Sequence, residues 1–187
     1  MGGNVERKVK VAEVALRALL CALGALAAVL VATDSQTRTF FSLQKKAKFT
    51  DMKALVFLVV ANGVAAGYSL LQLARCAVAM ARGGGRPLLS RALAWSVFSC
   101  DQAVAYVEMA AAAAALQASV ISKRGQPELQ WTGVCDLYGA FCRRAGGGIA
   151  SGIAAGLAAA LLASVSAFNL FRLYGAGAGA GKNGASW

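Results

Sequence analysis

The feature that most constrains this chain is the length of its uncharged apolar runs. Residues 145–171 form 27 consecutive positions without a formal charge, and residues 54–74 form another 21. About 20 apolar residues in a helix suffice to cross the hydrocarbon core of a bilayer. Each run is therefore long enough to span a membrane, which predicts an integral membrane protein.

Two further apolar segments bring the number of predicted spans to four. The four segments cover residues 14–32, 54–74, 92–121 and 145–171. A transmembrane β-barrel would need strands of about ten residues with strict apolar–polar alternation, and runs such as Ala110–Leu116 do not alternate. Because alanine and leucine are strong helix formers, we expect an all-α membrane protein, a four-transmembrane-helix bundle with both termini on one side.

The spans leave only short loops and tails. We expect a cytosolic N-terminal tail over residues 1–13, a membrane domain over residues 14–174, and a disordered, Gly/Ala-rich cytosolic tail over residues 175–187. No soluble catalytic domain fits in the remainder. The chain also lacks histidine, which is the usual general base and the commonest zinc ligand. We therefore expect no enzymatic activity, no metal and no cofactor.

The formal net charge of +11 does not orient the bundle. Nine basic residues flank the predicted helices on each side of the membrane, so the rule that cytoplasmic loops are richer in Lys and Arg gives a tie. The positive charge lies at the two membrane interfaces, where it suits the bilayer as a partner. No recognition fold fits in so short a loop, so we expect no nucleic-acid binding.

Two cysteines offer one indication of orientation. Cys135 and Cys142 lie seven residues apart in the third loop. Disulfides persist on the extracytoplasmic side, so a bridge between these residues would place that loop outside and both termini in the cytosol. Spacing alone leaves two reduced thiols equally open, because connectivity cannot be deduced from sequence.

Three ionisable residues interrupt the predicted spans: Arg17, Asp101 and Glu108. Each costs at least ~2.5 kcal/mol at the bilayer centre and therefore needs a partner or a water-filled path. Spans one and three run in the same direction, and an ion pair between Arg17 and Asp101 is geometrically reasonable. The pair either fixes which helices are neighbours, or Asp101 and Glu108 form part of an ion or proton path. Glu108 has no obvious cation at its depth, so a neutral side chain and a contact with another copy both stay open.

A stripe of small residues runs along the fourth span. Gly148, Gly152 and Gly156 recur every four residues, followed by Ala160 and Ser164. Small residues at this spacing allow another helix to approach closely. The stripe is explained equally well by packing inside one bundle and by self-association.

The loops carry two further distinctive stretches, FFSLQKKAKF over Phe40–Phe49 and PELQW over Pro127–Trp131. Together with Arg17, Asp101 and the two loop cysteines, they make the chain resemble the plant Casparian strip membrane domain protein-like (CASP-like) family, which is related to MARVEL-type membrane proteins. The resemblance covers roughly residues 9–174. It implies a plasma-membrane location with cytosolic termini, and it matches Arg17 and Asp101 to the family's intramembrane charged pair.

The founding members of that family are scaffolds that polymerise into an immobile plasma-membrane domain and recruit extracellular lignin-forming enzymes. Their first extracellular loop carries a Glu-Ser-Leu-Pro signature followed by a Phe-Phe-Thr-Gln-Phe run, whereas residues 37–43 here read TRTFFSL. The chain thus looks like one of the "like" members. The resemblance implies a scaffold that forms homo- or heterodimers, or larger assemblies with family members, and organises cell-wall-modifying enzymes. The alternative is a small ion or solute channel or transporter that uses Asp101 and Glu108.

Overall fold

The computed structural model describes residues 2–40, 43–81, 91–126, 128 and 130–174. Four long helices dominate it: α1 (Gly2–Ala32), α2 (Lys53–Ala81), α3 (Arg91–Arg124) and α5 (Gly139–Tyr174). All four are long and apolar enough to cross a membrane, over Arg7–Ala32, Lys53–Val78, Ala92–Arg124 and Gly139–Phe171. The prediction of a four-helix membrane bundle is confirmed.

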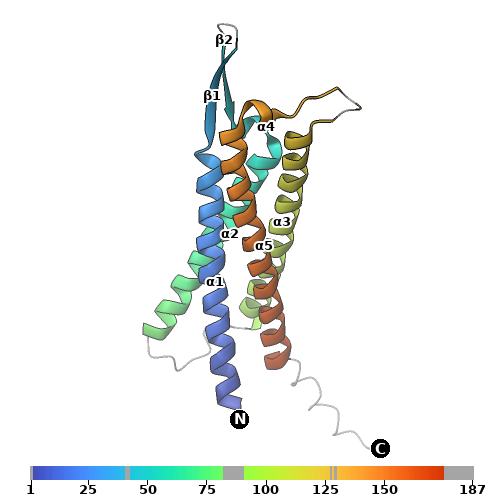
Figure 1. The fold of residues 1–187 in the computed structure, drawn as a ribbon. Coiled ribbons are helices and arrows are strands. Elements are labelled where there is room, and N and C mark those ends of the chain that lie inside the picture. The colour runs from blue at the N-terminus through green and yellow to red at the C-terminus, as the bar shows by residue number, and fades with distance from the viewer. Residues whose placement is uncertain (1, 41–42, 82–90, 127, 129, 175–187) are drawn as a thin grey trace, which may run out of the picture.

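The long helices run up and down along one bundle axis. The start of α1 and the end of α5 lie at the same end of the bundle, and a hairpin projects from the opposite end (Figure 1). In the following, these are called the terminal end and the hairpin end. α1 packs against α2 and α5, and α3 packs against the same two helices. α1 and α3 therefore face each other across the bundle.

The helices extend beyond the predicted spans. α1 already begins at Gly2, within the stretch predicted as an N-terminal tail over residues 1–13, because the polar residues there continue the helix beyond the apolar run. α5 begins at Gly139, several residues before the predicted span. The predicted tail over residues 175–187 lies outside the described residues.

The loop between α1 and α2 contains a β-hairpin, which the expectation of an all-α chain did not include. Strand β1 (Ser35–Phe40) pairs antiparallel with β2 (Leu43–Lys48), with Ser35 opposite Lys48. A single 3₁₀ turn, η1 (Phe49–Asp51), connects β2 to α2. Polar residues occupy both faces of the two strands, so no apolar–polar alternation marked them in the sequence.

Two local contacts define the hairpin end. Gly125 ends α3 with a φ of +67°, and its N–H donates to the Ile121 carbonyl at 2.8 Å. A Cβ at this position would overlap the Trp131 carbonyl oxygen, so the left-handed turn requires glycine. The N–H of Phe141, in the first turn of α5, donates to Gln36 Oε1 at 3.0 Å. That bond attaches the hairpin to α5 and satisfies a helix-terminal donor.

Two apolar clusters fill the bundle. The hairpin-side cluster consists of Val31, Leu55, Leu58, Ala61, Ala111, Ala115, Tyr138, Phe141, Ala145 and Ile149. The terminal-side cluster consists of Leu20, Ala65, Ala105, Ala155, Ala158, Ala159, Leu162 and Ala163. Alanine dominates the second cluster, so the helix backbones approach closely there, as is typical of packing between membrane helices.

The short helix α4 (Val134–Leu137) precedes α5 and lies at the hairpin end.

Candidate functional site

Two buried charges, one on α1 and one on α3, meet in the terminal half of the bundle. Arg17 of α1 reaches across the bundle to Asp101 of α3, with Nη2 3.0 Å from Oδ2 and Nη1 3.2 Å from Oδ1. Arg17 is 1% exposed and Asp101 is 2% exposed. Two parallel N–H···O bonds of this kind fix the orientation of both groups as well as their separation.

Two more side chains complete this cluster. Tyr68 of α2 donates its hydroxyl hydrogen bond to Asp101 Oδ1 at 2.8 Å, and the Arg17 guanidinium lies 5.9 Å from the centre of the Tyr68 ring. Glu13, one turn before Arg17 on α1, accepts from Arg17 Nη2 at 3.0 Å and from Nε at 3.2 Å. These four residues are called the charge cluster below, and they join α1, α2 and α3.

The two buried charges of the charge cluster have unequal numbers of oppositely charged partners. Glu13 is 27% exposed through its side chain, so it forms the edge of the cluster. Asp101 has no cation other than Arg17 among the described residues, whereas Arg17 has two carboxylates. Loss of Arg17 would therefore leave Asp101 without a described cation, whereas loss of Asp101 would leave Arg17 paired with Glu13.

Glu108 lies apart from the charge cluster. It is 0% exposed, and neither carboxylate oxygen has a hydrogen-bond partner in the described part of the chain. Its backbone and Cβ lie against Gly156 of α5, so the carboxyl group sits inside the bundle and not on an outer face where a second copy could reach it. Burying a carboxylate without a cation costs several kcal/mol, and no described residue supplies a compensating charge to Glu108.

A second polar side chain lies close to the level of Glu108. Asn62 of α2 is fully buried, and its Nδ2 donates to the Leu58 carbonyl at 3.0 Å, while its Oδ1 has no partner among the described residues. Glu108 and Asn62 separate the hairpin-side cluster from the terminal-side cluster. Ala105, a member of the terminal-side cluster, lies between Asp101 and Glu108 on α3.

The glycine stripe of α5 is used within this one bundle. A Cβ on Gly148 would overlap the Val31 side chain of α1. A Cβ on Gly152 would lie 3.0 Å from Leu58 Cδ1 of α2, and one on Gly156 would lie 3.4 Å from Met109 Sδ of α3. The three glycines thus admit a different neighbouring helix at each step, so the stripe is occupied by intrachain contacts.

The hairpin end carries a disulfide. Cys135 of α4 and Cys142 of α5 are bonded, with their Cα atoms 5.6 Å apart. Asp34 lies just beyond α1 at the same end and is 3% exposed. Burial raises the pKa of Asp34, and the positive charge of Arg144 partly opposes that rise.

The described residues provide no metal site, since no group of three or more His, Cys, Asp or Glu side chains comes together in them. Cys21, Cys76 and Cys100 are free.

Sequence reasoning did not assign Tyr68 or Glu13 to the cluster. Glu13 could have been found, because a carboxylate four residues before an arginine lies next to it on a helix. Tyr68 could not, because its contact with Asp101 depends on how α2 packs against α3.

The Casparian strip membrane protein domain matches residues 6–167. The chain is 73% identical to CASP-like protein 2U1 of Sorghum bicolor over 94% of this chain and 93% of that protein. It is 72% identical to CASP-like protein 2B1 of Oryza sativa subsp. japonica over 98% of each, and 57% identical to CASP-like protein 2B1 of Ricinus communis over 94% and 86%.

No solved structure matches the chain. The family domain covers the charge cluster, the disulfide, the whole of α2 and α3 and most of α1 and α5, and these two relatives are aligned over 93% and 98% of their length. This chain belongs to the CASP-like family of plant membrane proteins.

Proposed function

We propose that the protein is a non-enzymatic scaffold of the plasma membrane. It associates with copies of itself and with related family members through its membrane helices. Its termini lie in the cytosol, and its hairpin end is presented to extracellular partners, among them cell-wall-modifying enzymes.

One observation carries the proposal: the intramembrane charges do not form a path. Arg17 neutralises Asp101 within hydrogen-bond distance, and apolar Ala105 separates Asp101 from Glu108 along α3. A transport path would need polar stations in series and commonly broken helices, whereas α3 is continuous from Arg91 to Arg124. The buried polar residues instead hold the helices in one arrangement.

Since the α5 stripe is filled, an interface between copies must use another face. The outward face of α3 carries Tyr106, Ala110, Ala113 and Gln117, all exposed, at spacings of four, three and four residues. Tyr106 is 73% exposed and lies near the middle of the helix. Its hydroxyl makes no hydrogen bond to the described residues, which is unfavourable against lipid tails. Small residues flanked by hydrogen-bonding groups are typical of association between membrane helices.

The hairpin end fits an extracellular location. The disulfide lies at this end, and disulfides persist outside the reducing cytosol. The hairpin carries Arg38, Lys45, Lys46 and Lys48 and no acidic residue, so an extracellular partner that binds there has an acidic surface.

The channel or transporter is the second candidate, and one observation favours it. Glu108, Asn62 and Ser69 are fully buried and each has an unpartnered oxygen, which is the chemistry that a proton or a cation would seek. In that case Asp101→Asn reaches the cell surface and loses flux, whereas in a scaffold the same substitution disturbs assembly or surface delivery.

The test compares two variants, each with one alanine replaced by leucine, in differently tagged copies of the chain. Ala113→Leu enlarges the proposed interface, and Ala25→Leu enlarges an exposed position of α1 as a matched control. We expect co-purification of the two tags and slow fluorescence recovery in the membrane for the parent and for Ala25→Leu, and loss of both for Ala113→Leu. Tyr106→Phe, which removes only the hydroxyl, weakens association without abolishing it. A freely diffusing parent protein that conducts ions in liposomes would overturn the scaffold.

A further inference from the structure

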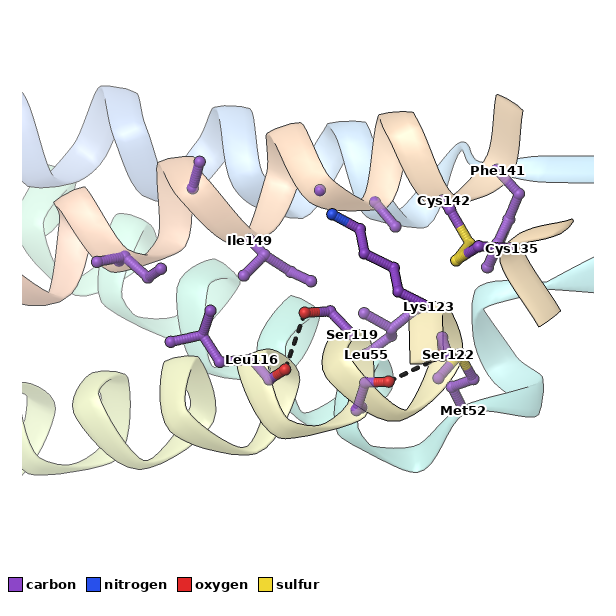
Figure 2. Close-up of a pocket in the computed structure, with 15 residues that line it drawn as sticks. Met52, Leu55, Leu116, Ser119, Ser122, Lys123, Cys135, Phe141, Cys142 and Ile149 are labelled. Atoms are coloured by element: carbon purple, nitrogen blue, oxygen red, sulfur yellow. Dashed lines mark hydrogen bonds between the residues drawn. A yellow bond between two sulfur atoms is a disulfide. The ribbon is translucent and has the colours of Figure 1, made fainter. Parts of the chain in front are cut away.

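A cavity of about 210 Å³ opens at the hairpin end, between α3 and α5. Figure 2 shows it bounded by α3 on one side and α5 on the other, with the disulfide at one end. Leu55 of α2 and Ile149 of α5 form buried walls, whereas Leu116 of α3 and Ala150 of α5 are exposed at the rim. The cavity therefore communicates with the outer surface of the bundle, where lipid surrounds the helices.

The hydroxyl groups in the walls of the cavity already donate hydrogen bonds within the protein. Ser119 and Ser122 of α3 line it, but both hydroxyls donate to carbonyls of their own helix at 2.8 Å, those of Leu116 and Ala118. The other lining residues, Lys123 aside, are apolar side chains, a glycine and the two half-cystines. Such a lining suits a hydrocarbon occupant.

Lys123 is the single charged residue of the lining. It lies in the last turn of α3, where a lysine side chain reaches the membrane interface. In Figure 2 its amino group extends from α3 across the cavity toward α5. It forms no ion pair or hydrogen bond with any residue that the structure describes, and no acidic residue lines the cavity. The site thus presents one uncompensated positive charge above an apolar space.

The volume limits what can enter. An engineered apolar cavity of about 150 Å³ holds benzene, and pockets that enclose whole drug-sized ligands measure about 300–1,000 Å³. About 210 Å³ lies between these values, so the cavity accepts a segment of hydrocarbon chain and is too small to enclose a fused-ring sterol.

We propose that this cavity binds one acyl chain of an anionic glycerophospholipid, with the lipid phosphate on the Lys123 amino group. A chain that moves from the bilayer into the cavity leaves one apolar medium for another, so it gains little from the hydrophobic effect. Selection among lipids therefore comes from the head group. An ion pair between an exposed lysine such as Lys123 and an anionic head group contributes about 0.2–1 kcal/mol, which corresponds to at most about fivefold in affinity. The binding does not require self-association of the protein.

The test uses the full chain in nanodiscs of phosphatidylcholine. The probes are phosphatidylglycerol and phosphatidylcholine, each with a photoreactive diazirine on one acyl chain, and labelled peptides are mapped by mass spectrometry. We expect the phosphatidylglycerol probe to label residues 116–123 and 145–153 preferentially, by up to about fivefold over the phosphatidylcholine probe. Excess inorganic phosphate leaves that labelling unchanged, which separates a bound lipid from a bound phosphate ion.

Adjacent residues supply matched controls. Lys123→Gln removes the preference for phosphatidylglycerol, whereas Arg124→Gln, which removes an exposed charge outside the cavity, retains it. A Cβ on Gly146 or Gly147 meets nothing within 4 Å, but only Gly146 lines the cavity. Gly146→Leu therefore abolishes labelling by filling the space, and Gly147→Leu does not.

Three results would overturn the proposal. If the two probes label the protein equally and Lys123→Gln has no effect, the labelling comes from lipids that surround the helices without specific binding. Displacement of the phosphatidylglycerol probe by a sterol would assign the cavity to a ring system. Crosslinks from a photoreactive residue at Ala150 to a second copy of the chain would show that protein, and not lipid, covers the cavity.

Discussion

Asp101 has one described cation partner, whereas Arg17 has two carboxylate partners. Substitutions of the two residues should therefore lower the free energy of unfolding by different amounts. Arg17→Gln leaves a buried carboxylate whose only described side-chain donor is the Tyr68 hydroxyl. Asp101→Asn leaves Arg17 with Glu13 at 3.0 Å, and the amide oxygen can still accept from Tyr68. We therefore expect the arginine substitution to cost more.

The magnitudes follow from the burial of each group. Removing one partner of a buried ion pair costs about 3–5 kcal/mol, which is the expected loss for Arg17→Gln. Losing charge-assisted hydrogen bonds while an alternative carboxylate remains costs about 1.5–3 kcal/mol, which is the expected loss for Asp101→Asn. The double variant leaves neither charge unpaired in the interior, so its loss falls below the sum of the single losses by ~2 kcal/mol.

The assay is reversible unfolding in mixed micelles, in which added sodium dodecyl sulfate unfolds the bundle and circular dichroism reports the helix content. Glu13→Gln is the control, with an expected loss of about 0.2–1 kcal/mol because Glu13 is partly exposed. The reasoning is refuted if the two single losses are additive, or if Asp101→Asn costs as much as Arg17→Gln.

Three further expectations use the same unfolding assay. Gly24→Ala costs about 1–3 kcal/mol, because its Cβ would lie 3.0 Å from the Asn62 carbonyl oxygen, whereas Gly63→Ala, with nothing within 4 Å, is neutral or slightly stabilising; equal effects would contradict the packing. Glu108→Gln costs no more than about 1–3 kcal/mol, because one buried polar group without a described partner replaces another, and a loss of about 3–5 kcal/mol would reveal a cation beside it. The raised pKa of Asp34 means that the folded protein binds this proton more tightly than the unfolded chain, so stability falls as pH rises from the ordinary aspartate range through the raised pKa. Asp34→Asn should remove that slope and stabilise the protein at pH 7; an unchanged pH profile would exclude this role.

The membrane helices were predictable because length and the absence of charge suffice to identify them. The uncharged runs at 54–74 and 145–171 lie within α2 and α5. The true ends were not predictable, because α1 continues through polar residues that a hydropathy pattern assigns to water. The hairpin escaped prediction for a related reason: its strands have no apolar face, so their pairing leaves no periodicity.

The charge cluster was predictable in part. The cost of an isolated charge in a membrane points from Arg17 to Asp101, and the structure places these two residues in contact. The contact of Tyr68 with Asp101 depends on the helix arrangement, in which α2 packs between α1 and α3. A single sequence does not show which helices pack against each other. For the same reason, the sequence did not show whether the α5 glycines pack inside one bundle or against a second copy. The structure places α1, α2 and α3 against them.

The separation of Arg17 and Asp101 along the chain has a consequence for biosynthesis. The two residues are 84 positions apart, which at roughly 5–20 residues per second is about 4–17 s of translation. For most of that interval α3, which begins at Arg91, has not yet been synthesised. Glu13, one turn away on the same helix, accompanies Arg17 from the start and acts as its provisional counter-ion. A chain that stops before α3 therefore lacks the interhelical partner of Arg17 and keeps only the carboxylate of its own helix beside this charge.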